Sequence, residues 1–241
     1  MILDLCPSPA LYPYYEKEGD TVVMVDAFRA SATICAAFAA GASAVIPIAS
    51  IEEAKRYKSE GFLVGAERNA RKCDFADFGN SPFDYTPAQV AGRELVFTTT
   101  NGTQAIHAAR SCHRLFVGTF TNIDAVLEAA RNSSPRTVIL CAGWENRINI
   151  EDMLFGGAFA EKASEMEELI IGSDSVRIAC ELWKQAKDNP LEYVKNSDHY
   201  ARLVANGVAG DAPYCLEMNA VDLVPVYNKQ EKKLRITTLK K

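Results

Sequence analysis

The chain has 241 residues, 48% of them hydrophobic, which is enough for one large α/β domain or two small ones with a packed core. The formal net charge of -5 argues against nucleic acid as the main partner. Seven cysteines without a CxxC pair, and no secretory signal, favour free thiols in a cytoplasmic protein. The uncharged run 30–51 is divided by Gly41 and Pro47, so we predict a helix and a strand there and no membrane insertion.

Short apolar runs in the first two thirds of the chain have the length and β-branched content of buried strands. They are residues 21–25, 44–48, 62–66, 95–97, 115–119 and 137–141. A helical pattern follows nearly every run, and Ser50 with Glu53 gives one of these helices a capping box. This alternation is typical of a mostly parallel β-sheet flanked by helices, which is the α/β fold class that we predict.

The last third of the chain has a different pattern. Helices are expected at 173–187, 191–195 and 198–206, and strands at 223–227 and 233–237. We expect the two strands to form a short C-terminal β-hairpin, and exposure of that hairpin to solvent would explain the basic segment 229–241. We therefore predict a single domain over residues 1–241. The alternative is two subdomains, a βα core at 1–166 and a helical segment with the C-terminal strands at 167–241.

Residues 94–109 combine a short strand, a polar turn and an Ala-rich helix. The turn contains Thr100, Asn101, Gly102 and Thr103. The first amides of such a helix lack internal partners and lie at the positive end of its dipole, which suits an anion. Gly102 allows the backbone to turn tightly or to approach a ligand. The same pattern also fits a simple helix cap, and these residues alone leave both interpretations open.

Other expected strands also end in polar residues. In open α/β sheets, ligands bind beyond the carboxyl ends of the strands. The polar residues at those ends are Asp26, Arg29 and Ser31, then Glu67 and Arg68, then Asn80 and Ser81 after a long loop, and finally Arg147, Glu151 and Asp152. Carboxylates suit Mg²⁺, and arginines suit phosphate or carboxylate oxygens. The set predicts a site for a small, highly anionic, metal-bound substrate, although each side chain also fits a helix cap or a surface ion pair.

Several other chemistries find less support. The chain has three histidines; His107 and His113 lack a ligand partner at useful spacing, whereas His199 is a candidate for a substrate contact. The H-E-x-x-H zinc motif and the glycine-rich nucleotide motifs are absent from the sequence. Cys141 and Arg147 have the spacing of the anion loop in cysteine-dependent phosphatases, which gives a second hypothesis with Cys141 as the nucleophile. Glu145 lies inside that loop, and its charge would repel a phosphate.

Five segments carry a resemblance to a known family. They are VDAFRASATI (25–34), GAERNA (65–70), FGNSP (78–82), TTNGTQA (99–105) and EDMLFGG (151–157). With a later part containing Asn206, Asp211 and Cys215, this series resembles the ComB family, the 2-phosphosulfolactate phosphatases, over nearly the whole chain. The resemblance implies a Mg²⁺-dependent phosphatase that converts 2-phospho-3-sulfolactate to 3-sulfolactate and phosphate, a step of coenzyme M biosynthesis. One departure is Ala70, where the family is expected to favour Gly.

The predicted roles follow from this substrate. We expect Asp26, Glu67 and Asp152 to hold Mg²⁺, and Asp26, Arg29 and Glu67 to be catalytic. The predicted substrate contacts are Ser31, Arg68, Asn80, Ser81, Thr100, Asn101, Gly102, Thr103 and Arg147. Whether Asp26 is a metal ligand or a covalent nucleophile stays open. The competing hypothesis is a non-catalytic anion sensor that needs the same cations but not the carboxylates. We expect a small phosphorylated substrate as the partner, and a homodimer.

Overall fold

The computed structural model describes residues 1–166 and 168–236. Its strands are β1 Ile2–Cys6, β2 Thr21–Val25, β3 Ala44–Pro47, β4 Leu63–Arg68, β5 Arg71–Lys72, β6 Glu94–Thr98, β7 Arg114–Val117, β8 Arg136–Cys141, β9 Ile170–Ile171, β10 Pro225–Asn228 and β11 Lys233–Ile236. Its α-helices are α1 Ala30–Ala39, α2 Ile51–Ser59, α3 Pro87–Val90, α4 Gly102–Ala109, α5 Ile123–Arg131, α6 Ile150–Met166, α7 Asp174–Ala186, α8 Pro190–Val194, α9 Asp198–Ala205 and α10 Ala212–Cys215. Short 3₁₀ helices are η1 Pro9–Tyr14, η2 Pro82–Asp84, η3 Phe120–Asn122 and η4 Ala209–Asp211.

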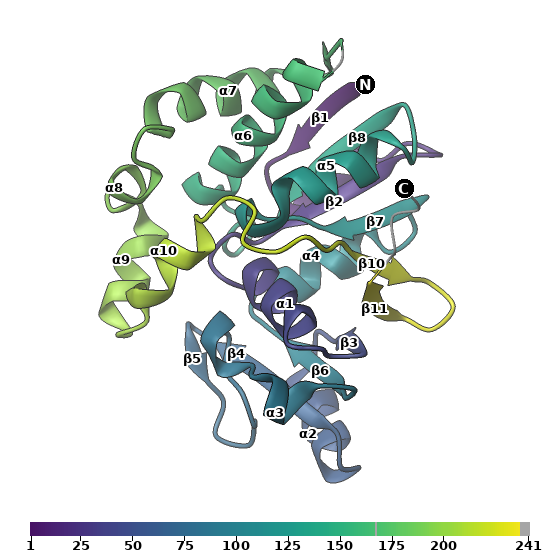
Figure 1. Ribbon diagram of the computed structural model, residues 1–241, viewed down its shortest axis with the longest axis vertical. Helices are drawn as coiled ribbons and strands as arrows, with labels where there is room; N and C mark the ends of the chain where they lie inside the picture. Colours follow the sequence, from purple (N-terminus) through teal and green to yellow (C-terminus); the bar gives the residue numbers. More distant parts are fainter. Residues whose placement is uncertain (167, 237–241) are drawn as a thin grey trace.

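The strands form one mixed sheet in the order β5-β4-β6-β3-β11-β10-β7-β2-β8-β1-β9. Two parallel groups make up most of it: the small group β4, β6 and β3, and the large group β7, β2, β8, β1 and β9. The hairpin β10–β11 joins them through antiparallel pairing with β7 and β3, so the two groups run in opposite directions. Figure 1 shows this hairpin between the groups, reached by the yellow segment that follows α10. The predicted fold class is confirmed.

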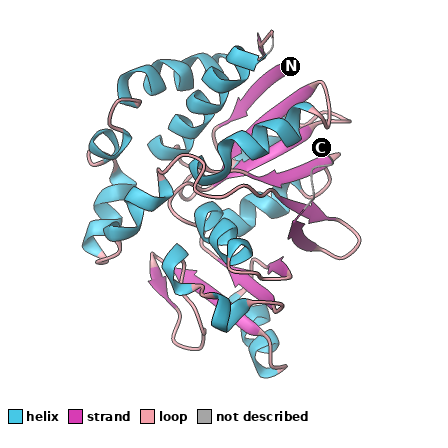
Figure 2. Ribbon diagram, in the orientation of Figure 1, coloured by secondary structure: helices cyan, strands magenta, loops and turns pink. Residues whose placement is uncertain are grey.

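Strand β2 shows why the sheet is buried on both faces. All five residues of its sequence TVVMV are inaccessible to solvent. Successive side chains of a strand point to opposite faces, so Val23 and Val25 join one hydrophobic core with α5 and α6. Val22 and Met24 join the other core with α1 and α4. Helices therefore cover both faces of the large group, as Figure 2 shows, and the continuous apolar run is the expected signature of such a strand.

Two features differ from the sequence-based prediction. The first is β1, which was not predicted because its sequence ILDLC is short and contains a charge; Asp4 is buried there in an ion pair with Arg136. The second is the position of the hairpin, which lies inside the sheet and not on the surface. Leu234 of β11 is fully buried and pairs with Val45. The segment's described basic residues are partly neutralised, since Lys233 pairs with Glu94 at 2.7 Å.

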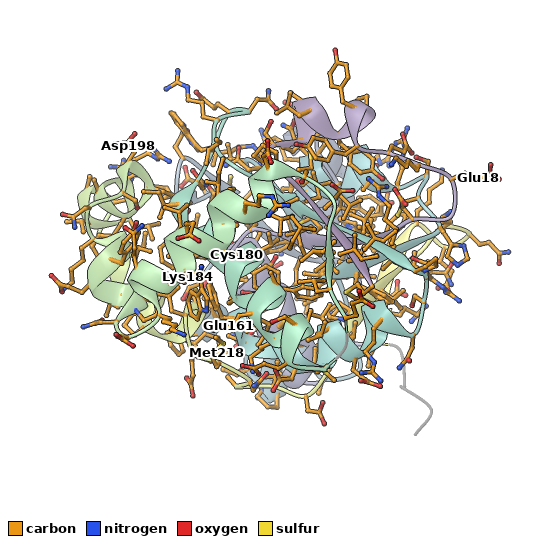
Figure 3. All side chains as sticks on the ribbon, turned by 90° about the horizontal axis from the view of Figure 1, so that it is seen from above. Glu18, Glu161, Cys180, Lys184, Asp198 and Met218 are labelled. Atoms are coloured by element: carbon orange, nitrogen blue, oxygen red, sulfur yellow. The ribbon has the colours of Figure 1, made fainter. Side chains whose placement is uncertain are left out.

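Helices α6 and α7 form a layer beside β1, and α8, α9 and α10 extend it toward the carboxyl ends of the large group (Figure 1). Glu161, Cys180 and Lys184 lie together on the α6–α7 layer, and Asp198 marks the start of α9 at one side of the molecule (Figure 3). Residues 30–51 fold as α1 followed by β3, as predicted. Within the described ranges, none of the helices is both long and apolar enough to cross a membrane. Residue 237, the last of the predicted strand 233–237, lies outside the described residues, and the prediction about domains stays a prediction.

Candidate active site

A small pocket, with a cavity volume of about 100 Å³, lies where loops from both strand groups meet. Loops after β2 and β8 reach it from the large group, and loops after β4 and β6 reach it from the small group. The residues that line it are Asp26, Phe28, Arg29, Glu67, Asn69, Ala70, Asn80, Thr100, Asn101, Trp144, His199, Arg202, Leu203 and Asn206. Seven of the sequence-predicted residues therefore line one cavity: Asp26, Arg29, Glu67, Asn80, Thr100, Asn101 and His199.

Asp26 follows β2 directly and is only 6% exposed. Its carboxylate accepts a hydrogen bond from the Ala30 N–H at 3.4 Å. Across residues 1–166 and 168–236, no Lys, Arg or His nitrogen lies within ion-pair distance of it. Burial raises the pKa of Asp26 to about 6, while His199 opposes this shift and Glu67 adds to it. A buried carboxylate without a cation partner is characteristic of a functional site.

Glu67, at the end of β4, holds two loops of the small group together. One oxygen, Oε1, accepts from the Ala70 N–H at 2.6 Å and from the Thr100 hydroxyl at 3.1 Å. The other, Oε2, accepts from the Thr100 N–H at 3.3 Å. Ala70 reaches Glu67 because it adopts a left-handed backbone with φ of 65°. That conformation favours glycine, which is the physical reason to expect Gly at this position.

Gly102 begins α4 against the Asp26 loop. A side chain there would place its Cβ 2.7 Å from the Ala30 Cβ and 2.9 Å from an Asp26 oxygen, so only glycine allows this close approach. Thr103 is fully buried behind it, and its hydroxyl donates to the Thr99 carbonyl at 3.1 Å. Ser31 is buried as well, and its hydroxyl accepts from the Asp26 N–H at 2.9 Å. Neither Ser31 nor Thr103 lines the pocket; Ser31 supports Asp26, which does, and Thr103 bonds to Thr99, which does not.

Arg29 lines the pocket but is already paired. Its Nη1 lies 2.5 Å from Asp211, and its Nη2 donates to the Ala70 carbonyl at 3.2 Å. The second oxygen of Asp211 accepts from the Ser81 hydroxyl at 2.9 Å, so Ser81 supports this ion pair from outside the pocket. Arg29 is consequently a fixed cation at the pocket wall, neutralised in part by a residue that is distant in sequence. Asn80 differs, because its buried Oδ1 has no hydrogen-bond partner within the described residues.

Two consecutive carboxylates at the start of α6 point in different directions. Asp152 accepts from the Ala27 N–H at 2.9 Å and from the Gly143 N–H at 3.0 Å, and it does not line the pocket. Burial, with the nearby charges of Glu151 and Asp26, raises the pKa of Asp152 well above its usual range. Glu151 is fully buried, and its Oε1 lies 2.5 Å from Nδ1 of His199, which also has Asn149 beside it. Because a carboxylate accepts, Nδ1 donates to Glu151, and Nε2 is left for the pocket.

Two predicted arginines lie outside the pocket. Arg68 follows Glu67 on β4, so its side chain points to the opposite face of the strand. There it donates to the Ala49 carbonyl and to the Thr98 hydroxyl. Arg147 is exposed, 5.6 Å from the centre of the Trp144 ring. The sequence reasoning did not select Arg202, whose guanidinium lies 4.0 Å from the centre of the same ring and which does line the pocket. Arg202 lies three residues after His199 on the same helix, α9, and this spacing could have indicated that both side chains reach the site.

Comparison with known proteins identifies the family. The model of the 2-phosphosulpholactate phosphatase family matches residues 6–230. The chain belongs to the 2-phosphosulfolactate phosphatase family. Curated proteins described as probable 2-phosphosulfolactate phosphatases are similar over most of their length. That of Caldanaerobacter subterraneus subsp. tengcongensis is 35% identical over 85% of this chain and 86% of its own. That of Thermotoga petrophila is 36% identical over 88% and 91%, and that of Symbiobacterium thermophilum is 33% identical over 90% and 95%.

Some side chains that line the pocket have the oxygen atoms that Mg²⁺ needs as ligands. The described ranges contain no group of three or more His, Cys, Asp and Glu placed to hold a metal. Mg²⁺ in proteins commonly takes one or two carboxylates and completes its shell with water and substrate oxygens. Asp26 and Glu67 line the pocket, and the unpartnered Oδ1 of Asn80 is a further oxygen in its wall. These three fit the ion, whereas Asp152 does not line the pocket and accepts from the backbone behind it.

The geometry opposes the cysteine-phosphatase hypothesis. Cys141 is fully buried at the end of β8, and it does not line the pocket. Burial, with Asp152 and Cys6 nearby, raises the pKa of its thiol well above the usual range. A nucleophilic cysteine needs the opposite, a lowered pKa and access to substrate. Arg147 is exposed and does not line the pocket, so the buried Cys141 and Arg147 do not form an anion loop.

Proposed function

We propose that this chain is a phosphatase that hydrolyses 2-phospho-3-sulfolactate, or a closely related small phosphomonoester, to the alcohol and inorganic phosphate. The main support is the pocket itself, in which two buried carboxylates, Asp26 and Glu67, face three cationic or potentially cationic side chains. A substrate with several negative charges would match the cations, and a bound cation would neutralise the carboxylates. The family relationship supplies the reaction class.

Mg²⁺ is part of this proposal. Asp26 and Glu67 would hold it, with Asn80 contributing its amide oxygen. When bound, the ion supplies charge neutralisation for the phosphate and lowers the pKa of a bound water. The raised pKa of Asp26 supports this assignment, because a cation placed beside the carboxylate would relieve the cost of its burial.

The other pocket residues have roles that follow from their positions. Thr100 and Asn101 lie at the amino-terminal end of α4, where the helix dipole favours phosphate oxygens. Arg29, fixed by Asp211, places a cation at the wall without mobility. His199 is oriented by Glu151 and lines the pocket, and in its doubly protonated form it can donate the Nε2 proton to the alkoxide oxygen that leaves phosphorus. Preorganised donors of this kind stabilise charge that develops in the transition state.

Phosphate release from 2-phosphosulfolactate, with Mg²⁺ and with EDTA, tests the proposal. We expect release with Mg²⁺, its loss on chelation and its return when Mg²⁺ is added back in excess. Release that EDTA does not change would contradict the metal assignment. A folded protein that binds 3-sulfolactate but releases no phosphate from any small phosphomonoester would favour the non-catalytic sensor hypothesis.

A further inference from the structure

Helix α9 forms one wall of the pocket with a single face. His199, Arg202, Leu203 and Asn206 all line the pocket, and their spacing is that of one side of an α-helix. The helix is fixed at both ends. Ser197 caps it by accepting from the Tyr200 N–H at 3.1 Å, and Asn206 accepts from Arg71 of β5 at 2.8 Å. The side chains on this face are therefore held in place before any ligand arrives.

Arg202 is the unusual member of this face. Its guanidinium is half-buried and stacks on Trp144 at 4.0 Å from the ring centre. Within residues 1–166 and 168–236, it has neither a carboxylate at ion-pair distance nor a side-chain hydrogen bond. Burial lowers the pKa of the guanidinium, although Glu151 and Asp198 oppose the shift. By contrast, the pocket's other arginine, Arg29, is satisfied by Asp211 and by a backbone carbonyl.

A half-buried guanidinium with unused donors is suited to bind an anion. Arginine presents its N–H groups as a planar fork that matches the oxygens of phosphate, carboxylate or sulfonate. Stacking on an indole ring restricts the side chain to one orientation, so less entropy is lost when an anion binds. The carboxylates Asp26 and Glu67 lie at the ends of β2 and β4, near Arg29, whereas Arg202 reaches the pocket from a different element, helix α9.

We propose that Arg202, stacked on Trp144, binds the sulfonate of the substrate and thereby sets its specificity. This inference rests on the proposed function. Phosphate and carboxylate oxygens are good ligands for a hard cation, so these two groups suit the side of Asp26 and Glu67. A sulfonate is a much weaker base and needs hydrogen-bond donors instead. The substrate class is therefore a phosphomonoester with a second, sulfonate-type anion that reaches Arg202.

The chain offers a matched control for the test. Arg147 contacts the same Trp144 ring from outside the pocket, at 5.6 Å from its centre. Arg202→Met keeps an unbranched stem on the indole ring but removes the charge, and Arg202→Lys keeps the charge but removes the fork. Arg147→Met removes an equal charge outside the pocket. Unchanged melting temperatures would show that all three variants fold.

The kinetic test compares 2-phosphosulfolactate with 2-phospholactate, which keeps the phosphate and the carboxylate but lacks the sulfonate. We expect Arg202→Met to lower kcat/KM about 10- to 100-fold for the sulfonated substrate, mainly through KM, as charge-assisted hydrogen bonds are lost. Activity on 2-phospholactate should change less than about threefold. For the sulfonated substrate, kcat/KM of Arg202→Lys should lie between those of Arg202→Met and the wild type, and kcat/KM of Arg147→Met should equal that of the wild type. An equal loss for both substrates, or no loss, would overturn the proposal.

A binding measurement separates this proposal from the proposed function. Calorimetric titration with 3-sulfolactate and with lactate needs no turnover. The wild type and Arg147→Met should bind 3-sulfolactate more tightly than lactate, and Arg202→Met should lose about 10-fold or more of that preference. This result would support the role of Arg202 even if no phosphate were released. Equal preference in Arg202→Met and the wild type would overturn it even if the protein were an active phosphatase.

Discussion

Strand β2 carries a buried aspartate at each end, and the two have opposite surroundings. Asp20, before the strand, is 2% exposed and pairs with Arg136, and it also accepts from the Lys17 N–H at 2.9 Å. Arg136 in turn pairs with Asp4 at 2.6 Å and donates to the Tyr15 carbonyl at 3.0 Å. Asp26, after the strand, has no cation at ion-pair distance among the described residues. The aspartate at the amino end of β2 thus belongs to an ion-pair network, whereas the aspartate at the carboxyl end has no cation partner.

The difference separates a stabilising cluster from a functional one. A buried charge is tolerated when its partners are complete, and removing one partner is costly because the other charge is left unpaired. Asp26 and Asp152 have pKa values raised mainly by burial, which means that folding opposes their charged forms. Buried charges that disfavour folding in this way are found where they are needed to bind a ligand. The following predictions test whether the two ends of β2 differ in this way.

The largest effect on stability is expected at the amino end. Asp20→Ala leaves the half-buried Arg136 with one carboxylate, Asp4, instead of two. We expect the free energy of unfolding to fall by about 3–5 kcal/mol. Urea unfolding at pH 7 measures it. A decrease of less than about 1 kcal/mol in the free energy of unfolding would mean that the network stabilises the fold no more than an exposed ion pair does.

The second effect concerns Asp26 and depends on pH. Its pKa of about 6 in the folded state is above the usual value of 3.8, so between these values the folded state binds more protons than the unfolded state. The stability of the wild type should therefore fall as pH rises from 4 to 6 on account of this group. Asp26→Asn removes that cost and should be more stable than the wild type by about 1–3 kcal/mol at pH 7.5. Near pH 4 the advantage should largely vanish.

Unfolding of both proteins without added metal, at pH 4.5, 6.0 and 7.5, measures this difference. Metal must be absent because an ion bound to the folded wild type would stabilise it by mass action. An advantage of Asp26→Asn that does not change with pH would contradict the account of Asp26.

A smaller effect is expected behind the pocket. Glu151→Gln keeps the volume of the buried side chain but removes the charge that orients His199 at 2.5 Å. We expect turnover to fall about 10-fold or more, as for groups that position a general acid. If the two residues act together, Glu151→Gln should add little to the loss caused by His199→Ala. Fully additive losses in the double variant would show that Glu151 does not act through His199.

The smallest effect is expected at Ala70. Its φ of 65° is unfavourable for a residue with a Cβ. Ala70→Gly should raise stability by up to about 1 kcal/mol, offset in part by the greater freedom of glycine in the unfolded chain. The hydrogen bond from the Ala70 N–H to Glu67 should persist, so turnover should stay within about twofold of the wild type. A clear loss of stability would mean that Ala70 is not strained.

Local pattern was enough to predict much of the fold and part of the site. The buried run of β2 and the turn 98–103 are encoded by consecutive residues, so both were predicted. Ser31 and Thr103 were predicted as ligand contacts because hydroxyls follow strands there, but these hydroxyls face inward and bond to the backbone. Arg29 and Asp211 are 182 positions apart, and no local pattern reports such a pairing. Arg147 was selected and Arg202 was not, because which of the two arginines near Trp144 lines the pocket depends on tertiary packing.

The position of the hairpin was also beyond local pattern. Lys233 and Arg235 suggested exposure to solvent, but Leu234 between them is fully buried beside Val45. Register in a mixed sheet depends on partners from distant segments, and a strand buried through alternate residues still shows charges on its other face. Local pattern therefore does not predict the order of the strands.

The central claim is that one end of β2 serves stability and the other serves function. Asp20→Asn and Asp26→Asn, measured side by side for phosphate release from 2-phosphosulfolactate with Mg²⁺ and for unfolding, test it directly. We predict that Asp26→Asn loses about 10³-fold or more in turnover without losing stability. Asp20→Asn should lose stability while its turnover below the melting temperature stays near that of the wild type. The account would be contradicted if Asp26→Asn retained turnover within about tenfold, or if both variants lost stability and activity together.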